Sequence, residues 1–200
     1  MDMSFTSQDP LGIACDLLIV PVTNDDGLAW SESAAAANSA LGGNLATAAE
    51  LEQFRGKSEA TLVLPSFGKL PAARVMLLGI GKIEEITQPS LAKSVGAALR
   101  EARTRGARSA VVALPDALPG IAPEDAVATA ALAAQLALYR FDAYRGTATK
   151  DERSKEIDSL VVVGSGVADD AGAAALARAA AIAGGVNLAR DLGNEPGKAL

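Results

Sequence analysis

The sequence contains no histidine and only one cysteine, Cys15. Without histidine, the chain can form no Ser-His-Asp triad, no Cys-His catalytic pair and no histidine-ligated zinc site. A single cysteine excludes an intramolecular disulfide and fits a reducing compartment. These two absences remove the most common hydrolase mechanisms from consideration for this chain.

Aromatic residues are also scarce, at 4% of the 200 residues, although hydrophobic residues make up 50%. This composition is sufficient for one domain with a full core built mainly from Ala, Leu, Val and Ile. The formal net charge of -6 opposes a phosphate backbone, so we expect no nucleic-acid partner. The start lacks the basic region of a secretory signal and segment 126–139 is too short to span a bilayer, so we expect a soluble cytoplasmic protein.

Short apolar runs predict the strands of a sheet. The run 74–81 is apolar throughout its centre and ends at Gly79 and Gly81, which is typical of a strand buried on both faces. Further strands are predicted at 16–22, 60–64, 110–114 and 159–163. We expect residues 60–64 to form a hairpin with the run 74–81, and a turn at 23–27.

Between these strands the sequence predicts helices and one polar loop. The helices are expected at 31–54, with a break at Gly42-Gly43, and at 89–105, 123–140 and 169–192, and the loop at 145–156. Alternation of strands and helices predicts an α/β fold of three layers, with a mostly parallel or mixed sheet between helices. Within that sheet we expect residues 75–78, 111–114 and 160–163 to be buried neighbours.

Two predicted strand exits carry glycines that could approach a phosphate, at Gly79-Ile80-Gly81 and at Gly164-Ser165-Gly166. In both, an acidic residue, Glu84 or Asp169, stands where a dinucleotide-binding pattern has its third glycine. The carboxylate would repel the phosphate. We therefore interpret these glycines as allowing a sharp exit from each strand.

Charged residues gather at five places. Four are acidic pairs, Asp25-Asp26, Glu84-Glu85, Asp151-Glu152 and Asp169-Asp170. Adjacent side chains point in different directions, so we expect turns and helix starts here rather than metal ligands. The fifth is the basic group Arg100, Arg103, Arg105 and Arg108, at the end of a predicted helix, where cations offset the helix dipole.

The last predicted helix contains Gly184 and Gly185. Each glycine costs a helix interior about 1 kcal/mol relative to alanine. We therefore predict that another element of the fold approaches the helix closely at these two residues.

The segment 187–196, Asn-Leu-Ala-Arg-Asp-Leu-Gly-Asn-Glu-Pro, closely resembles the one by which M17-family leucyl aminopeptidases pass from their N-terminal domain to their catalytic domain. The segment 139–144 and the strand that precedes Gly79-Ile80-Gly81-Lys82 resemble the family as well, in the same order. Gly197 and Lys198 depart from the family pattern. The resemblance implies that residues 1–186 form a macro-domain-like N-terminal domain and that residues 187–200 begin the linker to a C-terminal catalytic domain.

By the same resemblance, the parent enzyme releases N-terminal amino acids from peptides, forms a hexamer, and uses two divalent cations, zinc or manganese, in its catalytic domain. The family signature Asn-Thr-Asp-Ala-Glu-Gly-Arg is absent from this sequence, and the chain stops at Leu200, where we expect the catalytic part to begin. We therefore predict no catalytic, cofactor-binding or metal-binding residue in this chain, and a role in assembly or in limiting access to the active site.

Two alternatives stay open. One is a stand-alone macro-like module that binds ADP-ribose or another nucleotide at the loops after Val22, Gly79 and Gly164. The other is a nucleic-acid-binding regulatory domain that uses the basic segment 100–108.

Overall fold

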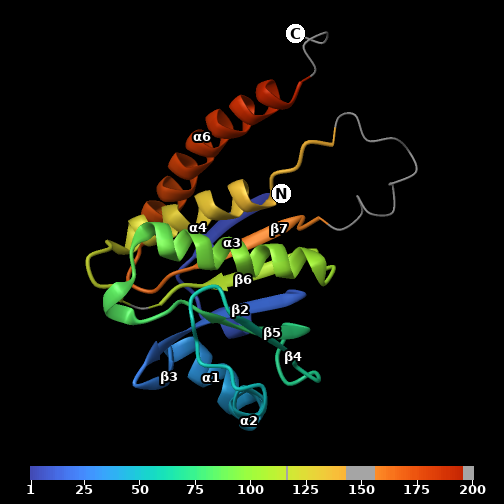
Figure 1. The fold of residues 1–200 in the computed structure, drawn as a ribbon, viewed down its shortest axis with the longest axis vertical. Coiled ribbons are helices and arrows are strands. Elements are labelled where there is room, and N and C mark those ends of the chain that lie inside the picture. The colour runs from blue at the N-terminus through green and yellow to red at the C-terminus, as the bar shows by residue number, and fades with distance from the viewer. Residues whose placement is uncertain (116, 143–155, 196–200) are drawn as a thin grey trace.

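The centre of the computed structural model, which describes residues 1–115, 117–142 and 156–195, is one mixed sheet (Figure 1). Its strands run in the order β1 (Asp2–Thr6), β7 (Ser159–Val163), β6 (Ser109–Ala113), β2 (Leu17–Asp25), β5 (Arg74–Gly79) and β4 (Thr61–Pro65). Strands β1, β7, β6, β2 and β5 are parallel to one another, and β4 pairs antiparallel with β5. The predicted fold class and the predicted hairpin are both confirmed.

Strand β2 lies between β6 and β5 in this sheet. Leu18 pairs with Val75 of β5 on one side and with Val111 of β6 on the other. The prediction that residues 75–78 adjoin residues 111–114 is therefore wrong, whereas β6 and β7 are neighbours as expected. Helix α3 (Gln88–Thr104) carries the chain from β5 over β2 to β6, and such a crossover leaves no trace in the apolar pattern of the strands.

Two strands of the sheet were not predicted. Strand β1 reads Asp-Met-Ser-Phe-Thr, and its alternation of polar and apolar residues suits an edge position. Strand β3 (Gly27–Trp30) folds back on β2, which extends to Asp25, so the turn expected at 23–27 is confined to Asp26. Gly27 has a φ of +124°, which favours glycine.

Helices cover both faces of the sheet (Figure 1). Helices α1 (Glu32–Ala40) and α2 (Asn44–Leu51) lie on one face, and α3, α4 (Pro123–Leu138) and the first part of α6 (Asp169–Asn194) lie on the other. Successive residues of β2 point to opposite faces, so Leu18 and Val20 join the core under α1 and α2, and Leu17 and Ile19 join the other core. This alternation produces two apolar layers from one buried strand.

Local signals in the sequence explain the helix ends. Thr87 and Ser90 form a capping box at the start of α3, and Gly106, at a φ of +74°, follows its end. Gly42 and Gly43 separate α1 from α2 with positive φ angles, as predicted. Two short 3-10 helices, η1 (Pro10–Gly12) and η2 (Ile83–Glu85), follow β1 and β5.

Helix α6 is longer than predicted and runs unbroken to Asn194, past the expected domain boundary at residue 186. Its length and its mean hydropathy of 1.3 would allow it to cross a membrane, a test that the core helix of a soluble protein also passes. Its first half packs on α4 and β1. The expected loop 145–156, except for Glu156, lies outside the described residues.

Candidate functional site

The second half of α6 extends away from the rest of the domain (Figure 1). Beyond Ala183, which is fully buried, large apolar side chains are exposed to solvent: Leu188 is 59% and Leu192 is 51% exposed. Gly184 and Gly185 have no atom within 4 Å of the place where a Cβ would stand. The predicted close approach at these glycines is therefore wrong, because the helix has already left the body of the domain where they occur.

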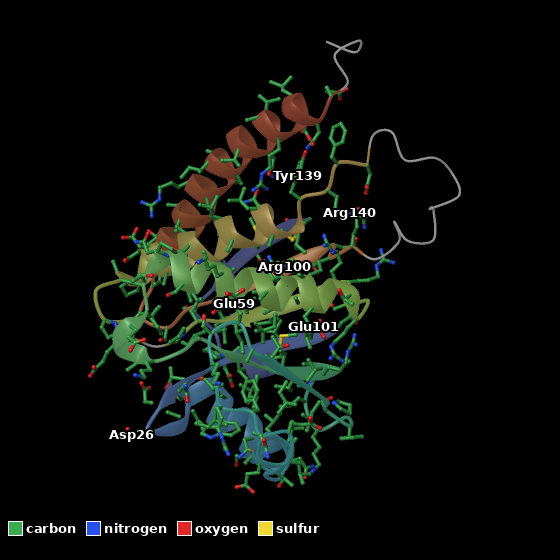
Figure 2. The ribbon with its side chains drawn as sticks, in the orientation of Figure 1. Asp26, Glu59, Arg100, Glu101, Tyr139 and Arg140 are labelled. Atoms are coloured by element: carbon green, nitrogen blue, oxygen red, sulfur yellow. The ribbon has the colours of Figure 1, made fainter. Side chains whose placement is uncertain are left out.

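Tyr139, from one family-like segment, meets residues 190–194, from the other, near the C-terminal end of α6 (Figure 2). The Tyr139 hydroxyl donates to Asp191 Oδ1 at 2.7 Å and accepts from Asn194 Nδ2 at 3.4 Å. Arg190 places its guanidinium 5.3 Å from the centre of the Tyr139 ring and donates to the Leu136 carbonyl at 3.1 Å. We call Tyr139, Arg190, Asp191 and Asn194 the junction site.

Helical periodicity places the junction residues of α6 and its exposed apolar residues on different faces. Arg190, Asp191 and Asn194 lie toward the end of α4. At 100° per residue, Leu188 and Leu192 lie on another side of the helix, where they are exposed. The junction site thus fixes the direction of the extension while its apolar face remains uncovered in this chain.

Electrostatics at the junction favour the neutral phenol. Partial burial and the hydrogen bond to Asp191 raise the pKa of Tyr139 above its ordinary value. The hydroxyl consequently remains a donor to Asp191 over the whole physiological pH range. No motif search would have paired these residues, because only the fold brings positions 139 and 191 together.

The strand exit at Gly79-Ile80-Gly81 leaves no amide free for a phosphate. The amides of Gly79, Ile80 and Gly81 donate to the carbonyls of Ala60, Val22 and Gly56. A Cβ on Gly79 would lie 2.1 Å from the Lys57 carbonyl oxygen, so a passing backbone segment explains this glycine. The interpretation of this exit as a tight strand end is supported by these contacts.

The exit at Gly164-Ser165-Gly166 leads to the start of α6, where two carboxylates occupy the first turn. Asp169 accepts a hydrogen bond from the Ser7 amide at 2.9 Å, and Asp170 accepts one from the Ala171 amide at 2.9 Å. These carboxylates use the positive end of the helix dipole that an anion would need. Asp169 thereby links α6 to the end of β1.

A pocket of about 260 Å³ lies at the carboxyl ends of β6 and β7, beside the start of α1. Such a position is typical of ligand sites in open α/β sheets. Its described lining includes the carboxylates of Asp9 and Glu32 and no lysine or arginine. The charge of this lining opposes a phosphate-bearing ligand.

Two further acidic pairs lie at the end of β2 and in η2. Asp25 accepts hydrogen bonds from the Thr23 hydroxyl at 2.6 Å and from the Ile83 amide at 3.1 Å, and Glu85 pairs with Lys82 at 3.3 Å. In residues 1–115, 117–142 and 156–195, no group of three or more Cys, Asp and Glu side chains could hold a metal ion. Asp151-Glu152 lies outside the described residues.

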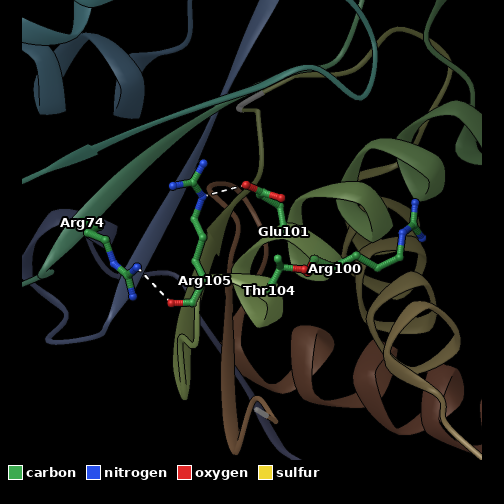
Figure 3. Close-up of polar contacts among 5 residues, drawn as sticks. All are labelled: Arg74, Arg100, Glu101, Thr104 and Arg105. Atoms are coloured by element: carbon green, nitrogen blue, oxygen red, sulfur yellow. Dashed lines mark hydrogen bonds and ion pairs between the residues drawn. The ribbon is translucent and has the colours of Figure 1, made fainter. Parts of the chain in front are cut away.

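The four arginines at the end of α3 do not converge. Figure 3 shows Arg100 and Arg105 extending to opposite sides of the helix, with Arg105 bound to Glu101 at 2.7 Å. Arg103 donates to the Leu138 carbonyl at 3.3 Å, and Arg108 binds Asp158 at 2.7 Å. Arg103 and Arg108 thereby attach α3 and the start of β6 to neighbouring segments, and Arg105 pairs within its own helix end.

Two titratable groups beside the start of β2 have structural roles. Burial raises the pKa of the Cys15 thiol to about 11, which keeps it protonated and unreactive. Asp16 accepts hydrogen bonds from the amides of Arg108 and Ser109 at 2.7 and 3.0 Å, and the Arg108 amide is the main cause of its lowered pKa. Asp16 therefore joins the beginnings of β2 and β6.

Comparison with known proteins gives a consistent result. The model of the cytosol aminopeptidase family, N-terminal domain, matches residues 19–148. Proteins named probable cytosol aminopeptidase are similar over most of this chain: one from Rhizobium etli is 40% identical over 86% of it, and one from a Geobacter species is 33% identical over all of it. The chain spans only 34% and 39% of these two relatives.

Solved structures share the fold. A tomato leucine aminopeptidase mutant superposes with a TM-score of 0.82 at 22% identity, over 100% of this chain and 39% of its own. The bottromycin maturation enzyme BotP, in complex with Mn, superposes with a TM-score of 0.66 at 22% identity, over 92% of this chain and 32% of its own. A macrodomain from Oceanobacillus iheyensis reaches 0.62 at 14% identity, over 89% of this chain and 90% of its own.

Proposed function

This chain belongs to the cytosol aminopeptidase family as its N-terminal domain, and from that premise we propose that it serves assembly and access control without catalysing a reaction. The observation that carries the proposal is the uncovered apolar face of α6 beyond Ala183. In the relatives, more than half of the protein lies outside the part that this chain matches. We propose that this further part, the catalytic domain, packs against Leu188 and Leu192.

The junction site supports this arrangement. Tyr139, Arg190 and Asp191 tie the last turns of α6 to the end of α4, and they thereby hold the extension in one direction. A helix held in this way presents its apolar face to a second domain in a fixed orientation. A large exposed apolar surface beside such an anchor is typical of an interface.

For the whole protein we propose the family reaction, release of N-terminal amino acids from peptides, in a cytoplasmic hexamer. Two divalent cations, zinc or manganese, would be held by the catalytic domain and by no residue of this chain. The manganese in the BotP structure supports manganese as one candidate. Three of the described carboxylates support the assignment of the metals elsewhere, since Asp25 accepts from the Ile83 amide, Asp169 accepts from the Ser7 amide and Glu85 pairs with Lys82.

A joined protein tests the docking proposal. Residues 1–200 are fused to the matching C-terminal region of the Rhizobium etli relative, and leucine release from leucine amide is measured with manganese. We expect Leu188→Asp and Leu192→Asp to lower the activity and the size of the assembly, because each places a charge in the interface. Leu51→Asp is the matched control, since Leu51 is 79% exposed on α2, away from α6.

Full activity and assembly in both α6 variants would contradict the docking proposal. A separate assay of the unfused chain tests the non-catalytic role. We expect no leucine release with zinc or manganese, and no rise in Tm from either metal. Metal-dependent turnover that disappears on replacing Asp169-Asp170 or Glu84-Glu85 by alanine would contradict that role.

The macro-like alternative is not favoured, even though macrodomains share the fold. The acidic lining of the pocket at β6 and β7 and the occupied amides at Gly79 to Gly81 both oppose a diphosphate. Calorimetry with ADP-ribose should show no binding. The nucleic-acid alternative is not favoured either, because Arg100 and Arg105 extend to opposite sides of α3, and Arg105 and Arg108 already bind Glu101 and Asp158. We expect no retention on DNA at low salt.

A further inference from the structure

A second pocket, of about 390 Å³, lies beside the junction site. It is bounded by α3, the end of α4, the middle of α6 and the segment before β7. This volume falls within the usual range of small-molecule sites. The family-like segments contribute Arg140 and Asn187 to its walls.

The charged groups that line this pocket are of both signs. Arg103, Arg140 and the N-terminal ammonium group of Met1 are cations, and Asp142 and Glu156 are carboxylates. A lining that contains both signs can receive the two charges of one ligand, a carboxylate against the cations and an ammonium group against the carboxylates.

Two buried polar atoms in the pocket walls have no hydrogen-bond partner among the residues that the structure describes: the Gln135 Nε2 atom and the Asn187 Oδ1 atom. Each unsatisfied group costs about 1–3 kcal/mol when water is excluded from it. One atom is a donor and the other an acceptor, so a ligand that satisfies both must itself accept one hydrogen bond and donate another.

Arg103 is the cation best placed to receive a carboxylate. Arg140 already pairs with Asp142, at 3.0 Å between Nε and Oδ2. Arg103 donates to the Leu138 carbonyl, and within the described part of the chain no ion pair joins it to a carboxylate. Burial, followed by the nearby charges of Arg140 and Arg100, lowers the pKa of Arg103, and a bound anion would offset that repulsion.

We propose that this pocket binds a free α-amino acid with an apolar side chain. Its carboxylate would lie against Arg103 and the Gln135 amide, and its ammonium group would donate to Asn187 Oδ1 on the side of the carboxylates. The apolar wall formed by Leu138 and Ile157 would receive the side chain. If the whole protein has the proposed function, this amino acid is also a product of its reaction. That one expectation rests on the proposed function, and the binding site itself does not.

Such a ligand would connect α4 with α6 beside the junction site. Gln135 belongs to α4 and Asn187 to the extending half of α6, so one amino acid between them would favour the observed direction of α6. Because binding of the amino acid depends on this direction of α6, the bound amino acid in turn stabilises that direction. An amino acid could thereby influence how the second domain is held.

Calorimetry with the 200-residue chain tests the proposal with four probes. We expect leucine to bind. Leucine amide, which lacks the carboxylate, and 4-methylpentanoate, which lacks the ammonium group, should bind at least about tenfold more weakly, as expected from the loss of one charged hydrogen bond. Phosphate, which has no ammonium group, should also bind at least about tenfold more weakly than leucine. Equal affinity for leucine and both analogues, or no heat from leucine, would overturn the proposal.

Variants separate ligand contact from a structural role. Arg103→Gln and Asn187→Ala should each weaken leucine binding at least about tenfold, whereas Arg105→Gln, which loses its partner Glu101 outside the pocket, should not. Gln135→Leu removes an unsatisfied donor, so it should weaken leucine binding without lowering Tm. Unchanged binding in Gln135→Leu and Asn187→Ala would overturn the proposal. Failure here would leave the docking proposal intact, because that one is tested by the assembly of the fused protein.

Discussion

The two halves of α6 belong to one unbroken helix and both contain glycine, yet their surroundings are opposite. In residues 169–183, Gly172 is buried, and a Cβ there would lie 2.0 Å from the Phe5 ring. In residues 184–194, Gly184 and Gly185 face open space. The same residue type therefore marks a close contact in one half and an uncovered helix in the other, and only the tertiary structure distinguishes them.

The largest effect is expected for Gly172→Ala. The new methyl group would overlap Phe5, which lies on the edge strand β1, so helix and strand must separate. Overpacking of this kind costs about 3 kcal/mol of the free energy of unfolding. Urea denaturation measures it, and a loss below about 0.5 kcal/mol would show that α6 is not seated on Phe5.

A truncated leucine in each half gives the next largest difference. Leu176 is 8% exposed, and Leu176→Ala should cost about 2 kcal/mol of the free energy of unfolding. Leu188 is 59% exposed, so Leu188→Ala should change it by less than about 0.5 kcal/mol in the unfused chain. Equal losses in the two variants would mean that the extending half is also packed.

Gly184→Ala should have the opposite sign. A methyl group at this position meets no atom, and alanine favours the helix by about 0.5–1 kcal/mol over glycine. Thermal unfolding should therefore show a higher Tm for Gly184→Ala than for the unchanged chain. A lower Tm would restore the original prediction of a close approach at this glycine.

The smallest effect is expected for Tyr139→Phe, which removes the hydrogen bond from α4 to Asp191. The folded-state pKa of Tyr139 is raised above its unfolded value, so the contribution of the hydroxyl is fully present below about pH 10. It is lost as the pH rises through the folded-state pKa. Stability of the two proteins, measured between pH 7 and pH 11, should differ at low pH and converge at high pH, and a gap that widens with pH would contradict this sign.

Much of the fold could be predicted because its strands are buried on both faces and its helices carry clear end signals. Thr87 at the start of α3 and Gly42-Gly43 between α1 and α2 are examples. Strand order could not be predicted, since the pairing of Leu18 with both Val75 and Val111 depends on a crossover over β2. The roles of individual glycines in α6 depend on contacts with distant segments, so local helix propensity did not reveal them.

The candidate site was predicted in part. The segment 187–196 was recognised by its resemblance to the family, but its contact with Tyr139 was not, because 52 residues separate Tyr139 from Asp191. The pocket beside it was also missed. Gln135 and Asn187 are ordinary helix residues in sequence, and only the packing of α6 on α4 buries their amide atoms without partners.

Hydrogen exchange across α6 tests the central claim most directly. It compares the amides of residues 184–194 in the unfused chain and in the chain fused to the Rhizobium etli region, with residues 172–183 as the internal reference. We predict fast exchange of residues 184–194 in the unfused chain and exchange about 100-fold slower in the fused protein, because the second domain then covers the helix. Equal rates in the two proteins would contradict the claim that the extending half of α6 is the docking surface.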